Sequence, residues 1–157
     1  MKKHWKTYVI AILIPLAVGG LSAFLTRNNM DIYKQVTTPP LSPPGWLFPI
    51  AWTALYILMG FSSARVWLDP EGSKAREHGL LSYGISLFMN FMWSIIFFNM
   101  RSFLFAFVWL VGLLFFILRT AYFYNRIDKT AAKLQIPYIL WVSFAGYLNL
   151  GIYLLNR

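Results

Sequence analysis

The sequence contains no cysteine, and only five of its 157 residues are acidic. The lack of cysteine excludes a disulfide framework, a thiol nucleophile and a thiolate metal site. None of the acidic residues falls within a long hydrophobic run, which disfavours a pump or ion-coupled transporter that works through a carboxylate at membrane depth. The acidic residues, all in segments that we expect to be loops, are Asp31, Asp69, Glu71, Glu77 and Asp128.

Histidine is scarce as well. The two histidines, His4 and His78, each stand beside the charged flank of a hydrophobic run, and neither has a partner at the spacing of a metal-ligand pair. We therefore predict no metal site, and we expect that no cofactor is required.

Hydrophobic residues, in contrast, make up 59% of the chain, and aromatic residues make up 19%. A helix needs about 20 apolar residues to cross a bilayer, and the sequence offers five such runs. A cleaved signal peptide is the alternative for the first run, but it lacks a small-residue cleavage site before a polar domain, so a helix is favoured. We predict an all-α membrane protein, a five-helix bundle forming one domain over residues 1–157. Its expected helices are 5–26, 46–67, 79–98, 103–124 and 131–155.

The formal charge of +9 could indicate a nucleic-acid partner. The basic residues, however, lie in short segments between the apolar runs, so we expect membrane lipid and no nucleic acid as a partner. Ten of them flank one side of the predicted membrane, which by the positive-inside rule places the N-terminus in the cytoplasm and both the first loop and the C-terminus outside. The ten are Lys2, Lys3, Lys6, Arg65, Lys74, Arg76, Arg119, Arg126, Lys129 and Lys133, against Arg27, Lys34, Arg101 and Arg157 on the other side.

Five of the eight prolines fall between residues 39 and 49. This segment cannot form a regular helix or a central strand, because proline lacks an amide donor and restricts the preceding residue. It ends the loop 27–45, which is too long for a tight turn between helices and is predicted to be a lid. Directly after it, Phe48, Trp52 and Tyr56 recur every four residues and therefore share one face of the second helix.

Polar side chains also recur at helical spacing in the third and fifth runs. Asn90 and Asn149 need hydrogen-bond partners at membrane depth, and each lies in a stripe of aromatic and polar residues. If the stripes face the second helix, they enclose a flat aromatic pocket beneath the lid, suited to a planar hydrophobic ligand. Ordinary helix packing and interhelical hydrogen bonds are the alternative. The predicted pocket residues of the three helices are Trp52, Tyr56, Asn90, Trp93, Tyr138 and Trp141, with Ala145 as a small gap in the last stripe.

Three ordered motifs carry a resemblance to a known family. They are the segment 39–46 (PPLSPPGW) followed by Trp52 and Tyr56; the segment 90–94 (NFMWS); and Pro137-Tyr138 followed by Trp141, Ala145 and Asn149. In these motifs the chain resembles the TspO or translocator proteins, also called tryptophan-rich sensory proteins or the peripheral benzodiazepine receptor family.

The resemblance implies a five-helix membrane bundle, usually a homodimer, that acts as a receptor or sensor. Its ligands would be porphyrins such as protoporphyrin IX, other tetrapyrroles or benzodiazepine-type compounds. By motif position, the ligand-binding residues would include Tyr33, Trp52, Asn90, Trp141 and Ala145. Some bacterial members degrade protoporphyrin in light and oxygen, which would make porphyrin a substrate and Trp52 and Trp141 the catalytic residues.

Two other functions remain open at this point. The same pocket would serve a transporter that moves porphyrin or sterol across the membrane. A structural partner protein, in which the aromatic residues only pack the helices, would bind no ligand at all.

Overall fold

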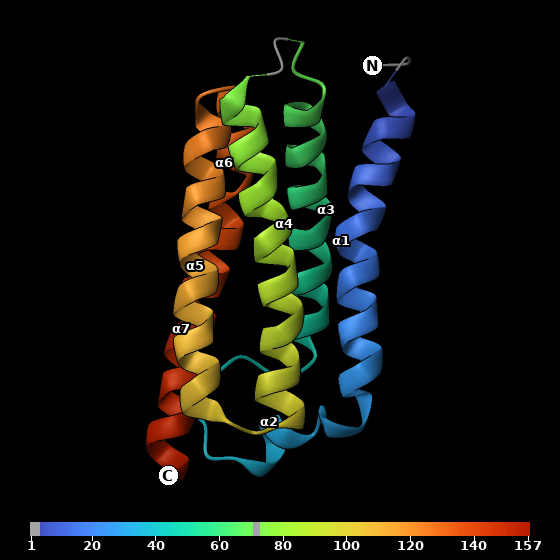
Figure 1. Cartoon of the computed structure of the whole chain (residues 1–157). Coiled ribbons are helices and arrows are strands. Elements are labelled where there is room, and N and C mark those ends of the chain that lie inside the picture. Colours follow the sequence, from blue (N-terminus) through green and yellow to red (C-terminus); the bar gives the residue numbers. More distant parts are fainter. Residues whose placement is uncertain (1–3, 71–72) are drawn as a thin grey trace.

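The computed structural model describes residues 4–70 and 73–157, and throughout this part of the chain every regular element is a helix. Helices form because the apolar runs of the sequence are long and contain few residues that break helices. The elements in chain order are α1 (Trp5–Thr26), η2 (Arg27–Asn29), α2 (Ile32–Gln35), α3 (Leu47–Trp67), α4 (Lys74–Ser94), η3 (Ile95–Asn99), α5 (Phe103–Asn125), α6 (Lys129–Leu134) and α7 (Ile136–Asn156) (Figure 1).

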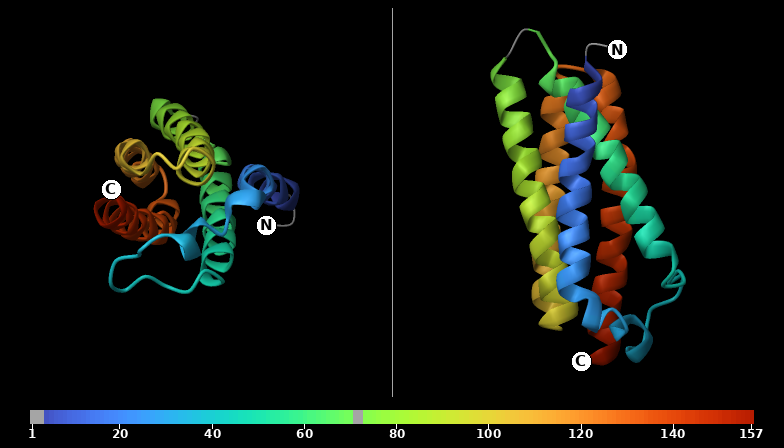
Figure 2. Two further views of the ribbon diagram at one scale, coloured as in Figure 1. Left: turned by 90° about the horizontal axis from the view of Figure 1, so that it is seen from below. Right: turned by 90° about the vertical axis from the view of Figure 1, so that its right-hand side faces the viewer.

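Within the described residues, five helical stretches are long and apolar enough to cross a membrane. They are built on α1, α3, α4, α5 and α7, so the predicted all-α fold with five membrane-spanning helices is confirmed. The N-terminal end of α1, the end of α3, the start of α4 and the α5–α6 turn lie at one end of the bundle (Figures 1 and 2). The lid, with α2, lies with the C-terminus at the other end (Figures 1 and 2).

The helices form a bundle in which α1 packs against α3 and α4, while α5 packs against α4 and α7. The backbones of α1 and α3 come close together at Gly60. A Cβ atom placed on Gly60 would lie 2.6 Å from the backbone oxygen of Ala11. Glycine therefore allows the two backbones to touch at the end of the bundle remote from the lid.

Two of the predicted helix boundaries are wrong. The third helix starts at Lys74 instead of Gly79, because the Ser73 side chain accepts a hydrogen bond from the backbone amide of Arg76 and caps the helix. Its charged first turns extend beyond the apolar run that served to predict it. It also continues through a π-helical turn, η3, to Asn99.

The predicted fifth helix, 131–155, is divided into α6 and α7. Asp128 caps α6 by accepting hydrogen bonds from the amides of Thr130 and Ala131. The division falls at Gln135, directly before the first turn of α7, which contains Pro137. Proline cannot donate the backbone hydrogen bond that would continue the helix, and its ring clashes with the carbonyl four residues earlier.

Lys2, Lys3 and Glu71, which entered the charge arguments above, lie outside the described residues.

Candidate functional site

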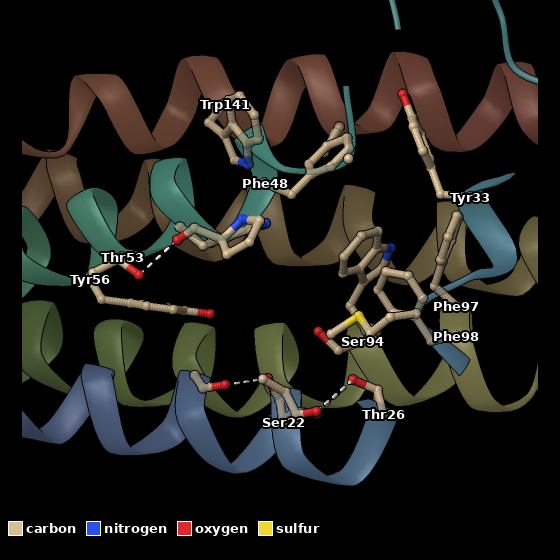
Figure 3. Close-up of a pocket in the computed structure, with 18 of the residues that line it drawn as sticks. Ser22, Thr26, Tyr33, Phe48, Thr53, Tyr56, Ser94, Phe97, Phe98 and Trp141 are labelled. Atoms are coloured by element: carbon tan, nitrogen blue, oxygen red, sulfur yellow. Dashed lines mark hydrogen bonds between the residues drawn. The ribbon is translucent and has the colours of Figure 1, made fainter. Parts of the chain in front are cut away.

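A cavity of about 460 Å³ lies under the lid, between α1, α3, the end of α4 with η3, and α7 (Figure 3). This volume falls in the range typical of small-molecule sites. Most of its wall is apolar. It is lined by Leu16, Gly19, Gly20, Ser22, Ala23, Thr26, Met30, Tyr33, Gly45, Phe48, Pro49, Trp52, Thr53, Tyr56, Trp93, Ser94, Phe97, Phe98, Trp141, Ala145, Leu148, Asn149 and Ile152.

A continuous series of aromatic rings runs along this cavity from the lid to the middle of α3. Tyr33 of α2 meets Phe48 edge to face at 5.1 Å between ring centroids, and Phe48 meets Trp141 at 5.8 Å. Trp141 meets Trp52 at 6.3 Å, and Trp52 stacks on Tyr56 at 5.7 Å. The predicted four-residue spacing on α3 thus places Phe48, Trp52 and Tyr56 on one wall, as expected. Residues from three distant segments form a single aromatic surface.

The indole N–H of Trp141 is buried and has no hydrogen-bond partner among the described residues. An unpaired buried donor of this kind costs about 1–3 kcal/mol. The other buried indole of the wall is paired, because Trp93 Nε1 donates to Asn149 Oδ1 at 3.0 Å and Asn149 Nδ2 donates to the Phe103 carbonyl at 2.8 Å. Trp141 lines the cavity, but its donor is covered by neighbouring atoms, so the indole must shift before an acceptor in the cavity can reach it.

Two of the predicted pocket residues, Asn90 and Tyr138, do not line the cavity. Both are buried, and Asn90 Nδ2 donates to the Tyr138 hydroxyl at 3.0 Å. Tyr138 also packs edge to face against Trp52, with 6.2 Å between centroids. Their stripes face inward as predicted, and Tyr138 contacts Trp52 of the wall, but neither Asn90 nor Tyr138 lines the cavity.

The other six predicted residues reach the cavity: Tyr33, Trp52, Tyr56, Trp93, Trp141 and Ala145. Phe97 and Phe98 of η3 line it too, and the π-helical turn places these two consecutive rings there. Such turns are frequent at functional sites. Within the described residues, no group of three metal-ligating side chains comes together.

Sequence reasoning missed the contribution of α1, which adds Ser22 and Thr26 to the wall, and of Met30 from the first connection. The signal was present in the small residues Gly19, Gly20 and Ala23, which allow either a helix or a flat ligand to approach. The packing separates their roles. Gly19 contacts the Tyr56 ring, while Gly20 and Ala23 line the cavity and are exposed.

The lid is attached firmly to one side of the bundle. Asn156 at the end of α7 accepts a hydrogen bond from the amide of Thr37 at 2.9 Å and donates to the carbonyl of the same residue at 2.8 Å. The Tyr147 hydroxyl donates to the Pro40 carbonyl at 2.6 Å, and Gly151 leaves room for the ring of Pro39. The lid prolines thus rest on α7.

Comparison with known proteins identifies relatives over almost the whole chain. The model of the TspO/MBR family matches residues 11–155, a range that includes every residue lining the cavity. The chain is 38% identical over 157 residues to the tryptophan-rich protein TspO of Chlorobaculum tepidum, and the match covers 99% of each chain. It is 36% identical over 150 residues to the tryptophan-rich protein TspO of Archaeoglobus fulgidus, covering 94% of this chain and 95% of the relative. It is 33% identical over 151 residues to the translocator protein of Bos taurus, covering 95% and 89%.

Proposed function

The chain belongs to the TspO/MBR family of integral, multi-pass membrane proteins, and from this premise we propose that it is a membrane receptor for porphyrins and related flat hydrophobic molecules. The ligand would bind in the cavity beneath the lid, against the aromatic surface of Phe48, Trp52, Tyr56 and Trp141. Flat rings favour stacked and edge-to-face contacts with such a surface.

The aromatic wall of the cavity carries this proposal, because Phe48, Trp52, Tyr56 and Trp141 line one largely apolar space and contact one another in series. Trp141 also has a buried indole N–H without a partner among the described residues. An apolar cavity with few polar groups is suited to a flat molecule that carries a polar acceptor, such as a carboxylate or a ring nitrogen. Porphyrins such as protoporphyrin have both.

Absorbance titration of the purified protein with protoporphyrin IX tests the proposal. Wild type should shift the porphyrin absorption band in a saturable way. Trp141→Phe keeps a ring but removes the donor, and it should weaken binding about 3- to 10-fold, the equivalent of one hydrogen bond of about 0.5–1.5 kcal/mol. Trp67→Phe is the matched control, because Trp67 is 62% exposed at the far end of α3. A titration without saturation, or equal affinities for the two variants, would sink the proposal.

Light-dependent porphyrin degradation is a second candidate activity. It is favoured by the two indoles, Trp52 and Trp141, which both line the cavity with 6.3 Å between ring centroids. Electron-rich indoles at this position would lie beside an excited porphyrin, with dissolved oxygen as the oxidant. Under illumination in air, a distinct tetrapyrrole product should accumulate with wild type and more slowly with Trp52→Phe and Trp141→Phe. Bleaching at the rate of buffer alone would refute the activity.

A further inference from the structure

The cavity is exposed on one side of the bundle, between the C-terminal half of α1 and the N-terminal half of α3. Six of its lining residues are also exposed on the surface: Met30 and Gly45 at the lid end, Gly20 and Ala23 on α1, and Pro49 and Thr53 on α3. We call Gly20, Ala23, Pro49 and Thr53, which lie between the two helices, the side opening. They lie within helices long and apolar enough to cross the membrane, so the side opening faces lipid.

The opening exists because α1 and α3 contact each other at only some positions along their length. Gly60 brings the backbones together at the end remote from the lid, and Gly19 accommodates the Tyr56 ring near the middle. Beyond Gly19, a Cβ atom on Gly20 would find no atom within 4 Å. The right-hand view of Figure 2 shows the lower end of α3 diverging from α1.

No polar contact closes the opening. Of the side-chain hydrogen bonds in residues 4–70 and 73–157, none joins α1 to α3. The hydroxyls of Ser22, Thr26 and Thr53 instead donate to carbonyls of their own helices, at 3.0, 2.8 and 2.7 Å (Figure 3). These hydroxyls therefore need no partner from water or lipid, so hydrocarbon can lie against the opening without cost.

The opposite sides of the cavity are held shut. On the α7 side, Asn156 and Tyr147 bond the lid backbone. Towards α5, Arg101 donates to the side chain of Gln35 at 3.0 Å. The end of α1 is joined to η3, because Asn99 Nδ2 donates to the Leu25 carbonyl at 3.1 Å. Passage under the lid would break several of these bonds, whereas passage between α1 and α3 breaks none.

We propose that the ligand enters and leaves the cavity sideways from the bilayer, through the side opening, while the lid stays in place. This rests on the proposed function, because it concerns the route of the same flat hydrophobic ligand. Such a ligand partitions into the membrane before it binds, so a lipid-facing entrance spares it a return to water. The lack of a side chain at Gly20 and the small methyl group of Ala23 keep the entrance wide.

The test is the rate of binding. Protein reconstituted in phosphatidylcholine vesicles is mixed with protoporphyrin IX, and quenching of tryptophan fluorescence is followed by stopped flow. Ala23→Phe and Gly20→Phe should slow association and dissociation together, by roughly tenfold, as when binding must wait for a conformational change. Ala17→Phe is the matched control, since Ala17 is exposed on α1 but does not line the cavity. Loosening the lid with Asn156→Ala should leave the association rate unchanged.

Two results would overturn the route alone: rates in Ala23→Phe and Gly20→Phe equal to those of Ala17→Phe, or association that accelerates in Asn156→Ala. Weaker binding with an unchanged association rate would assign Ala23 to the cavity wall only and would also overturn it. If wild type shows no saturable quenching, the proposed function fails, and the route fails with it.

Discussion

Asn90 shows why a residue type and its spacing do not settle a role. Its amide lies at membrane depth on a stripe with Trp93, which predicted a place in the pocket. In the structure it donates to the Tyr138 hydroxyl and does not line the cavity. Bonds of this kind between membrane helices contribute about 0.6 kcal/mol and rarely more than about 2. The interhelical alternative therefore describes its observed contacts.

Asp128 lies outside the membrane-spanning segments, and its carboxyl makes the stability of the fold depend on pH. Burial raises the pKa of its carboxyl, but hydrogen bonds from Arg65, at 2.8 Å, and from the amides of Ala131 and Thr130 outweigh burial and hold the pKa below the ordinary value of 3.8. Because the folded pKa is lowered, the carboxylate stabilises the fold fully above about pH 4, and this contribution is lost as the pH falls through the folded pKa.

Asp128→Asn should therefore flatten the acid limb of a melting-temperature profile measured between about pH 2 and 7. Near neutral pH it should cost about 0.5–1 kcal/mol, since the ion pair is partly exposed. Glu77→Gln, at an exposed position of α4, is the control and should retain the wild-type profile. Identical acid limbs in Asp128→Asn and wild type would contradict the assignment.

Among the elements, α1 and α3 are joined by close backbone contact and by no side-chain hydrogen bond within the described residues. A Cβ atom on Gly60 would lie 2.6 Å from both the Ala11 oxygen and the Ile12 Cα, and neither backbone atom can move aside alone. The packing of α1 against α3 therefore depends in part on this crossing point.

Gly60→Ala should destabilise the protein by about 1–3 kcal/mol, because the helices must separate to admit the methyl group. Gly84→Ala is the matched control on α4: its added Cβ would find no atom within 4 Å, so this change should cost nothing and can gain up to about 1 kcal/mol of helix propensity. Thermal unfolding of the two variants in one detergent measures the difference. Equal melting temperatures would show that the crossing is looser than described.

For the whole molecule, the five spans place the two termini at opposite ends of the bundle (Figure 1). The lid end has four basic residues, and the described part of the other end has eight of the ten counted in the sequence. The positive-inside rule then predicts a cytoplasmic N-terminus and an external lid. The homodimer expected from the resemblance stays a prediction, which the molecular mass of the detergent-solubilised protein would test.

The absence of cysteine makes the orientation simple to measure. Lys34→Cys at the lid end and Lys129→Cys at the other end both replace exposed residues. A membrane-impermeant maleimide applied to intact cells stripped of any outer barrier should label the first variant, and it should label the second only after lysis. The reverse pattern would show that the bundle is inserted the other way.

The sequence by itself determined the helices, because apolar runs of about 20 residues have one stable form in a membrane. It also determined the face of α3 that bears Phe48, Trp52 and Tyr56, since that follows from the helical period alone. The same logic failed at the start of α4 and at Gln135, where a serine cap and a proline outweigh hydropathy.

Only the tertiary structure decided which inward-facing groups meet the cavity and which meet each other. The period places Asn90 and Trp93 on one stripe, but it does not say which ring lies in front of which amide. The unpaired donor of Trp141, the attachment of the lid to α7 and the lipid-facing gap beside Gly20 depend on contacts between segments far apart in the chain. Helical periodicity orients a side chain relative to its own axis, and helix packing determines what it faces.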